Sequence, residues 1–566
     1  MPLDGVTPFP PELAERYRRL GYWQDRPLGA VFRERFRAFG RREALVAGDE
    51  RVTYEELDRR SERLALHLLD LGLRPLDRVV VQLPNVAEFV YLYFALQRVG
   101  AIPLMALIAH REHEIRHYVT FVEAKGYAIP DRFRGFDFLA FARMILDGAP
   151  DLRHVLVAGD AELPGDPRFV SLRALLAREP RLAPTALEEL AIDPEDPCVF
   201  LLSGGTTGIP KVIPRTHNDY VFNSRGTADA CGITGDDTLL VCLPLGHNFP
   251  LGTPGMQAHF LKGGRVVLSP STAARDALPL VERERVTQLD TVPALLLSWL
   301  NDAELRRHDL SSVRVIRVAG QKCPAEIKPR VEAAFPNAKV TEGFGMGEGL
   351  IMWTRFDDPE EVRFHTVGRP WCPDDEIRLV DDDGNEVPPG EPGELLVRGP
   401  YTLRGYYRAP EANALAFTPD GFYRSGDVMR LHPTGRYVVE GRKKDLINRG
   451  GEKISAEEVE NLILALPAVR NVACVAMPDP VLGEKVCAFV VPHEGASVTL
   501  DDITAHLSAR GLARFKHPQR LELVDELPLS PVGKVQKRVL SERIAKLLAA
   551  EAAPGGRRDA TAGRNN

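Results

Sequence analysis

Apolar and polar residues follow each other in this chain with a period that switches repeatedly between that of a strand and that of a helix. Residues 77–83 form an apolar run typical of a buried strand, residues 85–99 fit a helix, and residues 101–105 fit a second strand. This order is that of a β-α-β unit and predicts a parallel sheet. Before it, residues 29–75 have the pattern of two amphipathic helices around a short turn.

The same alternation continues through the middle of the chain and predicts an α/β fold. Helices are expected at 254–261 and 324–335, and short strands at 198–202, 237–243, 264–268, 287–292, 313–318 and 338–341. Residues 155–200 have the pattern of a strand, a loop rich in proline, aspartate and glycine, and a helix with an acidic surface.

Two changes of pattern divide the C-terminal third. From Asp374 the chain has short strands and turns, which predicts a small β subdomain, and after Gly441 it has strands and helices that predict a compact α+β domain. The charged link 441–445 between them could act as a hinge. We therefore expect a large N-terminal domain at 1–443, a mobile C-terminal domain at 444–552 and a disordered tail at 553–566.

Composition narrows the class of protein. The 566 residues carry a formal net charge of -7 and no cluster of basic and aromatic residues, so nucleic-acid binding is not expected. The most apolar window, 87–109, is interrupted by polar residues, glycine and proline too early for a membrane span, and the N-terminus lacks the pattern of a signal peptide. Seven scattered cysteines without metal spacing indicate reduced thiols. We expect a cytoplasmic protein.

A glycine-rich stretch at 201–211 carries the first candidate chemistry. It places three hydroxyl side chains, three glycines, a proline and Lys211 directly after an apolar strand, a composition that suits a phosphate. No Gly-Lys-Ser/Thr follows at the spacing of a Walker loop. Alone, the stretch is as consistent with an ordinary polar turn as with a phosphate cradle.

Four further segments each place one charged residue in or beside a glycine-containing turn. Glu348 follows a predicted strand and suits a metal ion or nucleotide, Asp427 could accept both hydroxyls of a ribose, Arg442 offers a guanidinium, and Lys534 lies on a proline-bounded loop. Each segment by itself could equally be a simple turn.

Together, the five segments in this order resemble the superfamily of adenylate-forming enzymes over residues 30–550. Within it the chain resembles most the free-standing aryl-acid adenylating enzymes, the 2,3-dihydroxybenzoate–AMP and salicylate–AMP ligases of siderophore and antibiotic pathways. Segments that carry this closer match are 8–10, 22–23, 214–217, 246–251 and 399–402.

The resemblance implies a ligase that uses ATP and Mg²⁺ in two steps. A carboxylate attacks the α-phosphate to give an acyl adenylate and pyrophosphate, and a thiol then displaces AMP. The implied catalytic residues are Lys534, His247, Glu348, which also binds the metal, and Lys444, about which the small domain would rotate. The implied nucleotide-binding residues are Ser203, Gly204, Gly205, Thr206, Thr207, Gly208, Lys211, Gly320, Gly343, Phe344, Asp427 and Arg442.

The acid would lie against residues that the resemblance assigns to the aryl pocket: His247, Asn248, Phe249, Thr253, Gln321, Gly345 and Ile351. Asn248 would hydrogen-bond an ortho hydroxyl, so acids that lack it would leave this amide unsatisfied. The chain departs from the dihydroxybenzoate and salicylate pattern at Thr253, Gln321, Gly343 and Ile351, and has Gly347 where the superfamily usually has threonine. Gly343 should enlarge one end of the pocket. A substituted salicylate, a hydroxylated heteroaryl acid and a bicyclic acid all remain open.

The thiol must come from a partner, because the chain has no carrier-protein serine motif. We expect the phosphopantetheine thiol of an aryl or peptidyl carrier protein, with free CoA as the alternative. A non-catalytic homologue and a luciferase-like oxygenase are weaker alternatives, and the presence of Lys211, Glu348, Asp427 and Lys534 argues against the first.

Overall fold

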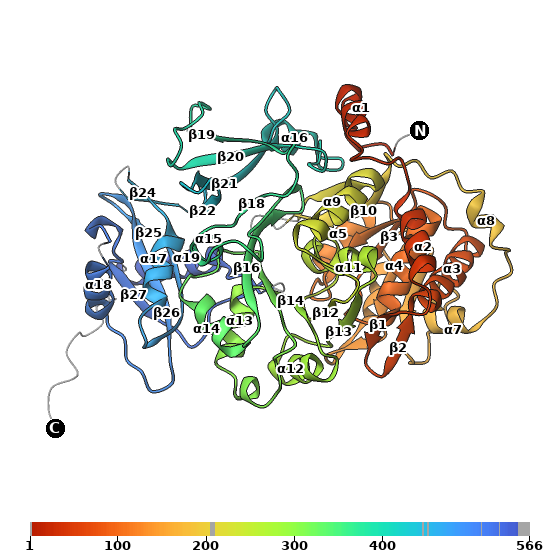
Figure 1. The fold of residues 1–566 in the computed structure, drawn as a ribbon, viewed down its shortest axis with the longest axis horizontal. Helices are drawn as coiled ribbons and strands as arrows, with labels where there is room; N and C mark the ends of the chain where they lie inside the picture. Colours follow the sequence, from red (N-terminus) through yellow and green to blue (C-terminus); the bar gives the residue numbers. More distant parts are fainter. Residues whose placement is uncertain are drawn as a thin grey trace.

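The computed structural model describes residues 3–203, 210–443, 446–449, 452–510, 512–530 and 533–552. Four main sheets organise these residues, and Figure 1 shows the C-terminal elements gathered at one end of the molecule, beyond the four-stranded sheet and the end of the nine-stranded one. The expected α/β class, with a small β part and a small α+β part near the C-terminus, is confirmed.

Two large sheets form the N-terminal part, and both are parallel except at their edges. The nine-stranded sheet consists, in spatial order, of β18 (Arg369–Pro370), β17 (Gly349–Trp353), β16 (Lys339–Met346), β15 (Val315–Val318), β14 (Gln288–Thr291), β12 (Thr238–Val241), β13 (Arg265–Leu268), β1 (Glu43–Ala47) and β2 (Glu50–Thr53). The seven-stranded sheet consists of β11 (Val212–Thr216), β10 (Pro197–Leu202), β4 (Ile102–Met105), β3 (Arg78–Val81), β5 (Gly126–Pro130), β8 (His154–Ala158) and β9 (Phe169–Ser171).

Smaller sheets complete the molecule. The antiparallel four-stranded sheet holds β19 (Glu376–Val380), β20 (Gly393–Arg398), β21 (Tyr423–Leu431) and β22 (Tyr437–Arg442). The C-terminal five-stranded sheet holds β24 (Glu452–Ile454), β23 (Ile447–Arg449), β26 (Gly483–Pro492), β25 (Val469–Asp479) and β27 (Arg520–Leu523). A short hairpin pairs β6 (Arg132–Phe133) with β7 (Phe136–Asp137).

The helices pack around these sheets. They are α1 (Pro11–Arg19), α2 (Leu28–Phe39), α3 (Tyr54–Asp70), α4 (Ala87–Val99), α5 (Glu112–Phe121), α6 (Phe138–Leu146), α7 (Leu172–Ala177), α8 (Thr185–Glu188), α9 (His217–Ala230), α10 (Asn248–Leu251), α11 (Met256–Lys262), α12 (Ala274–Arg283), α13 (Pro293–Leu300), α14 (Ile327–Ala334), α15 (Glu360–His365), α16 (Pro410–Ala416), α17 (Ala456–Leu464), α18 (Leu500–Ala509) and α19 (Lys537–Ala552), with 3₁₀ turns at Ala303–Arg306 and Arg514–Lys516.

The apolar window at 87–109 is explained by burial. Every residue of α4 is buried, so this helix is apolar on all sides because it lies in the main core, between α2 and α3 and the sheets. Among the described residues, none of the helices is both long and apolar enough to cross a bilayer.

One expectation about the N-terminal region is wrong. The segment between α2 and α3 is not a short turn but a β-hairpin, β1 and β2, and β1 joins the nine-stranded sheet in parallel with β13. The hairpin is short and its second strand has only one buried residue, Val52, so local periodicity carried little strand signal.

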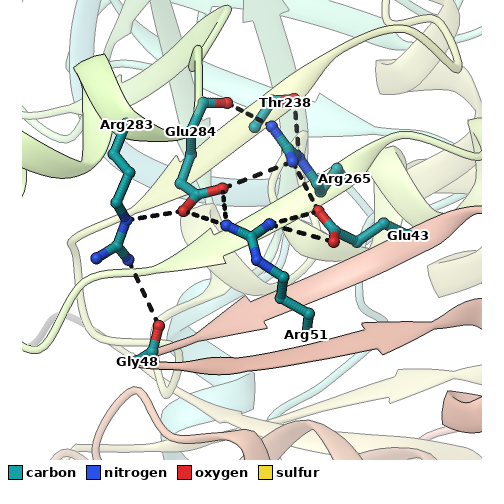
Figure 2. Close-up of polar contacts among 7 residues, drawn as sticks. All are labelled: Glu43, Gly48, Arg51, Thr238, Arg265, Arg283 and Glu284. Atoms are coloured by element: carbon teal, nitrogen blue, oxygen red, sulfur yellow. Dashed lines mark hydrogen bonds and ion pairs between the residues drawn. The ribbon is translucent and has the colours of Figure 1, made fainter.

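A network of charged side chains fastens this hairpin to the large sheet (Figure 2). The Glu284 side chain, 1% exposed, accepts hydrogen bonds from Arg51 of the hairpin at 2.8 and 2.9 Å and from Arg283 at 2.9 Å, and pairs with Arg265 at 3.6 Å. Glu43 bridges Arg51 and Arg265. Burial would raise the pKa of Glu284, but the hydrogen bonds from Arg51 and Arg283 lower it below its usual value.

We predict that Glu284→Ala destabilises the protein by about 2–3 kcal/mol, because three guanidinium groups lose the buried carboxylate that neutralises them. Urea unfolding followed by tryptophan fluorescence would measure the change. Glu282→Ala is the matched control: Glu282 is nearby on α12, its side chain is 46% exposed, and its loss should change stability by no more than about 0.5 kcal/mol. Equal effects of the two substitutions would contradict the structural role of Glu284.

Candidate active site

The candidate residues gather beyond the carboxyl ends of the parallel strands of the nine-stranded sheet. His247 and Asn248 follow β12 at the start of α10, Gly320 and Gln321 follow β15, and the 343–348 segment ends β16. This edge is where parallel α/β sheets bind their ligands, because the connecting loops open a crevice there. The fold thus brings together segments that are about a hundred residues apart in sequence.

Strand β16 is longer than the sequence pattern indicated. It runs through the glycines to Met346, turns at Gly347 and Glu348, and returns as β17 in antiparallel register, with Gly343 opposite Trp353 and Gly345 opposite Ile351. The expected strand at 338–341 ended too early because glycines weaken the strand signal. The pairing places Glu348 at a tight turn on the edge of the site.

Glu348 is held by two tyrosines that the sequence did not single out. Its buried carboxylate accepts a hydrogen bond of 2.8 Å from Tyr406, whose hydroxyl lies 2.9 Å from that of Tyr423. Burial and the charge of Glu348 raise the pKa of Tyr406, so this phenol stays protonated and donates. The ammonium group of Lys211 lies 4.8 Å from the centre of the Tyr406 ring, which links the end of the glycine-rich stretch to Glu348.

Asp427 and Arg442 form an ion pair across two strands of the four-stranded sheet. They are partners in the register of β21 and β22, and Arg442 Nε lies 2.9 Å from Asp427 Oδ1. Burial raises the pKa of Asp427 to about 6, against the opposing effects of Arg442 and Lys534. The carboxylate is therefore ionised at neutral pH and gains a proton in mildly acidic solution.

Lys534 reaches this site from the C-terminal part of the chain. It lies in the loop before α19, and a methyl group on Gly320 would lie 3.4 Å from Lys534 Cε. Burial and Arg442 lower the pKa of Lys534, whereas Asp427 and Glu348 favour its charged form. One cation thus faces two carboxylates and a guanidinium, all supplied by other elements.

His247 caps the N-terminus of the short helix α10. Its Nδ1 accepts a hydrogen bond of 3.3 Å from the backbone N–H of Phe249. Burial, reinforced by the charge of Lys534, lowers the pKa of His247 to about 3. This imidazole is neutral at physiological pH, and with Nδ1 as acceptor its proton is on Nε2.

The Asn248 amide is oriented by two hydroxyl groups. Tyr220 donates to its Oδ1 at 2.8 Å, and its Nδ2 donates to Thr253 Oγ1 at 3.1 Å. One N–H of the amide is used by Thr253 and one lone pair of Oδ1 by Tyr220, so Asn248 can offer a ligand its second N–H as well as the other lone pair of Oδ1. Thr253, which departs from the usual pattern of the resembling ligases, keeps the hydroxyl that fixes this amide.

Arg215, from the 214–217 motif, connects both halves of the site. It is completely buried, its Nε donates to Asp219 at 2.8 Å, and its Nη1 donates to the carbonyl of Gly347 at 3.0 Å. The guanidinium also lies 5.2 Å from the centre of the Tyr220 ring. Arg215 thus holds the turn that carries Glu348 and packs on the tyrosine that orients Asn248. Its only signal in the sequence was its place in a family-like motif.

The expectation that Gly343 enlarges the pocket is wrong. A Cβ atom on Gly343 would lie 2.5 Å from Trp353 Cε3 and 2.6 Å from two further atoms of the same ring, so the indole occupies the space that the glycine leaves. At Gly345, which is exposed, only the end of the Ile351 side chain comes close, with Cδ1 2.7 Å from where a Cβ would be. The cross-strand neighbour Trp353 therefore fills the gap beside Gly343.

The remaining candidate residues differ in how deeply they are buried, and several lie outside the described residues. Phe249 is buried, with its ring centre 5.8 Å from that of Trp353, whereas Phe344 and Gln321 are half-buried at the edge of the site. Ser203 and Lys211 close the base of the glycine-rich stretch: Ser203 N–H donates to the Lys211 carbonyl, and Lys211 N–H donates to Ser203 Oγ, both at 2.9 Å. Gly204, Gly205, Thr206, Thr207, Gly208 and Lys444 lie outside the described residues.

The donor set around Glu348 fits a magnesium ion that is held mainly by phosphates. Within the described ranges, no three His, Cys, Asp or Glu side chains gather as a metal site. Mg²⁺ commonly takes one or two carboxylates and completes its shell with water and nucleotide phosphates. Glu348, a single carboxylate at the tight turn between β16 and β17, suits that arrangement.

Comparisons with known proteins agree with this geometry. The AMP-binding enzyme family matches residues 32–407, and the AMP-binding enzyme C-terminal domain matches residues 458–534. A salicylyl-CoA synthase / salicylate adenylyltransferase from Streptomyces sp is 49% identical, over 96% of this chain and 98% of that protein. A salicyl-AMP ligase / salicyl-S-ArCP synthetase from Mycobacterium tuberculosis is 43% identical, over 96% and 95% of the two chains.

Among solved structures, the anthranilate CoA ligase AuaEII in complex with anthranoyl-AMP superposes with a TM-score of 0.85 at 26% identity, covering 93% of this chain and 98% of that one. Both family matches occur in the expected order, and the sequence relatives extend over nearly the whole chain. This chain belongs to the AMP-binding, adenylate-forming enzymes.

Proposed function

We propose that this enzyme activates an aromatic carboxylic acid, an ortho-hydroxy aryl or heteroaryl acid, as its acyl adenylate and then transfers the acyl group to the phosphopantetheine thiol of a carrier protein. The pathway would be one of siderophore or antibiotic biosynthesis. The single observation that carries the proposal is the position of Lys534, whose Cε lies 3.4 Å from the Cβ position of Gly320, at the same strand ends as Asn248. Its charge interacts there with Asp427 and Glu348.

In the first step, a carboxylate oxygen of the acid attacks the α-phosphorus of ATP, and the bond from phosphorus to the pyrophosphate oxygen breaks. The charges of both reactants must be neutralised and held in line for this displacement. Lys534 would bridge the acid and the α-phosphate, and its lowered pKa is consistent with a lysine that gains its charge partner when the substrates bind.

The nucleotide would be held by groups on three separate elements. Asp427 would accept hydrogen bonds from the ribose hydroxyls, with Arg442 fixing its carboxylate at 2.9 Å. Lys211 and the glycine-rich stretch would face the pyrophosphate end. Glu348, positioned by Tyr406, would hold Mg²⁺, which supplies charge neutralisation at the phosphates when bound.

The acid would be selected by the oriented amide of Asn248. Tyr220 and Thr253 fix the orientation of the amide and leave its second N–H for the acid, so an ortho substituent that accepts a hydrogen bond would satisfy this donor. A phenol oxygen or a ring nitrogen satisfies this requirement, whereas an ortho-hydrogen leaves a buried donor without a partner. The neutral His247 adds a second N–H, because its Nδ1 already accepts from Phe249.

In the second step, the thiol sulfur attacks the acyl carbon, and AMP leaves with the bonding electrons. The position of Lys534 beside Gly320 suits the first step. We therefore propose that the C-terminal domain rotates about Lys444 between the steps, as the resemblance implies. The carrier protein is the preferred acceptor and free CoA the alternative, since relatives named for each are similar to this chain.

The proposal is tested by acid-dependent exchange of pyrophosphate into ATP across a panel of benzoate, salicylate, 2,3-dihydroxybenzoate, picolinate and anthranilate. We expect exchange with acids that carry an ortho acceptor and at least about 100-fold less with benzoate. Subsequent incubation with a pantetheinylated carrier protein or with CoA identifies the acceptor. Failure of every aryl acid to support exchange would overturn the proposal.

We predict that Lys534→Ala lowers exchange by about 10²–10³-fold, because the developing charge loses its bridging cation. Thioester formation from supplied acyl adenylate should continue at nearly the normal rate. Lys546→Ala, an exposed lysine on α19, is the matched control and should leave both half-reactions intact. Equal loss of both half-reactions in Lys534→Ala would contradict the role of Lys534 in the adenylation step alone.

A pH dependence follows from Asp427. As the pH falls through about 6, its carboxylate gains a proton and can no longer accept two ribose hydroxyls, so the KM for ATP should rise about tenfold per pH unit below that value. Asp427→Asn should have a higher KM that lacks this steep dependence. Titration of ATP itself affects both proteins equally, so parallel profiles would contradict the prediction.

A further inference from the structure

The Trp353 indole lies flat against the backbone of Gly343. The Cβ position of Gly343 is 2.5 Å from Cε3 and 2.6 Å from both Cδ2 and Cζ3, three adjacent atoms of the six-membered ring, which is the geometry of an approach to the ring face. Gly343 has no left-handed φ that would require glycine. The absence of a side chain at 343 is therefore explained by the indole and not by the backbone conformation.

The indole is held by packing alone. Trp353 is 2% exposed, its ring lies beside Phe249, and its Nε1 is buried without a hydrogen-bond partner among the residues that the structure describes. A buried ring in a close-packed core cannot swing aside without displacing its neighbours. Replacing Trp353 by a smaller apolar residue would break no hydrogen bond of the indole.

The ring also lies within the proposed acid pocket. Gly343 and Gly345 face the same side of β16, where their partners in β17, Trp353 and Ile351, lie opposite them. Phe249, whose ring centre lies 5.8 Å from that of Trp353, follows directly after Asn248, the residue with the oriented amide. Trp353 thus contacts both Gly343 and Phe249, the residue that follows Asn248.

We propose that Trp353 sets the size limit of the aryl pocket and restricts the enzyme to acids with a single ring. This inference rests on the proposed function, because it assigns a specificity-determining residue to the same site. Gly343 leaves space beside its Cα, and the Trp353 indole fills that space. The second ring of a bicyclic acid would therefore compete with Trp353 for the same volume. The pair of residues, and not Gly343 alone, determines the length of the pocket at this end.

The first test compares salicylate with 1-hydroxy-2-naphthoate, which has the same ortho-hydroxy carboxylate on two fused rings. In pyrophosphate exchange, we expect the wild-type enzyme to favour salicylate in kcat/KM by about 100-fold, and Trp353→Leu to reduce that preference at least about tenfold. A wild-type enzyme that uses both acids equally, or a preference unchanged in Trp353→Leu, would overturn the inference.

Trp371→Leu is the matched control. The Trp371 ring also lies on a glycine, Gly226, and its Nε1 is also buried without a partner among the described residues. It differs in its neighbours, because it stacks on Tyr401 and packs at a tilt against Phe222. This substitution should lower the melting temperature while leaving the ratio between the two acids unchanged. The same change of ratio in both variants would indicate general loosening and count against Trp353.

A second test does not depend on activity. Gly343→Ala should lower the melting temperature because its methyl group meets the indole, and the Gly343→Ala/Trp353→Leu double variant should be more stable than the sum of the two single changes predicts. Additive changes would show that the residues do not compete for one volume. If no aryl acid supports exchange, the proposed function fails, and the melting temperatures still decide whether Trp353 fills the space beside Gly343.

Discussion

The antiparallel pairing of β16 with β17 is the constraint on which the rest of the site depends. Its register sets Trp353 opposite Gly343 and Ile351 opposite Gly345, and its tight turn carries Glu348. A shift of one residue would turn every side chain of one strand to the other face, so that Trp353 would no longer pack against Gly343. The pairing is anchored at the turn, where Arg215 donates to the Gly347 carbonyl from a different sheet.

Charge is concentrated where the parts of the chain meet. The C-terminal part supplies a single cation, Lys534, while the four-stranded sheet supplies Asp427 and Arg442 and the large sheet supplies Glu348. Burial raises the pKa of Asp427 and lowers that of Lys534, so both groups are less favourably charged than in water even though Arg442 pairs with Asp427 and two carboxylates act on Lys534. In the proposed reaction, the ribose hydroxyls of ATP would hydrogen-bond Asp427, and the negative charges of the phosphates and of the acid would stabilise charged Lys534. Binding of both substrates would therefore favour the arrangement in which Lys534 lies in the site.

Polar orientation and apolar packing divide the work of selecting an acid. Tyr220 and Thr253 fix the orientation of the Asn248 amide, and burial keeps His247 neutral. Trp353, Phe249 and Ile351 define the space beside these groups. A hydrogen bond discriminates strongly between acids with and without an acceptor, whereas packing discriminates by size.

The sequence by itself determined the α/β class, the β-α-β start, the small C-terminal sheet and the five segments proposed for the site, because period and glycine-containing motifs are local properties. It missed the β1–β2 hairpin, whose strands are short, and the continuation of β16 through its glycines, since strand formation there depends on pairing with β17. Only the tertiary structure decided that Tyr406 holds Glu348, that Tyr220 orients Asn248 and that Trp353 fills the space beside Gly343. These contacts join residues that are distant in sequence or lie across a strand pair, and the volume left by a glycine depends on the side chain that packs against it.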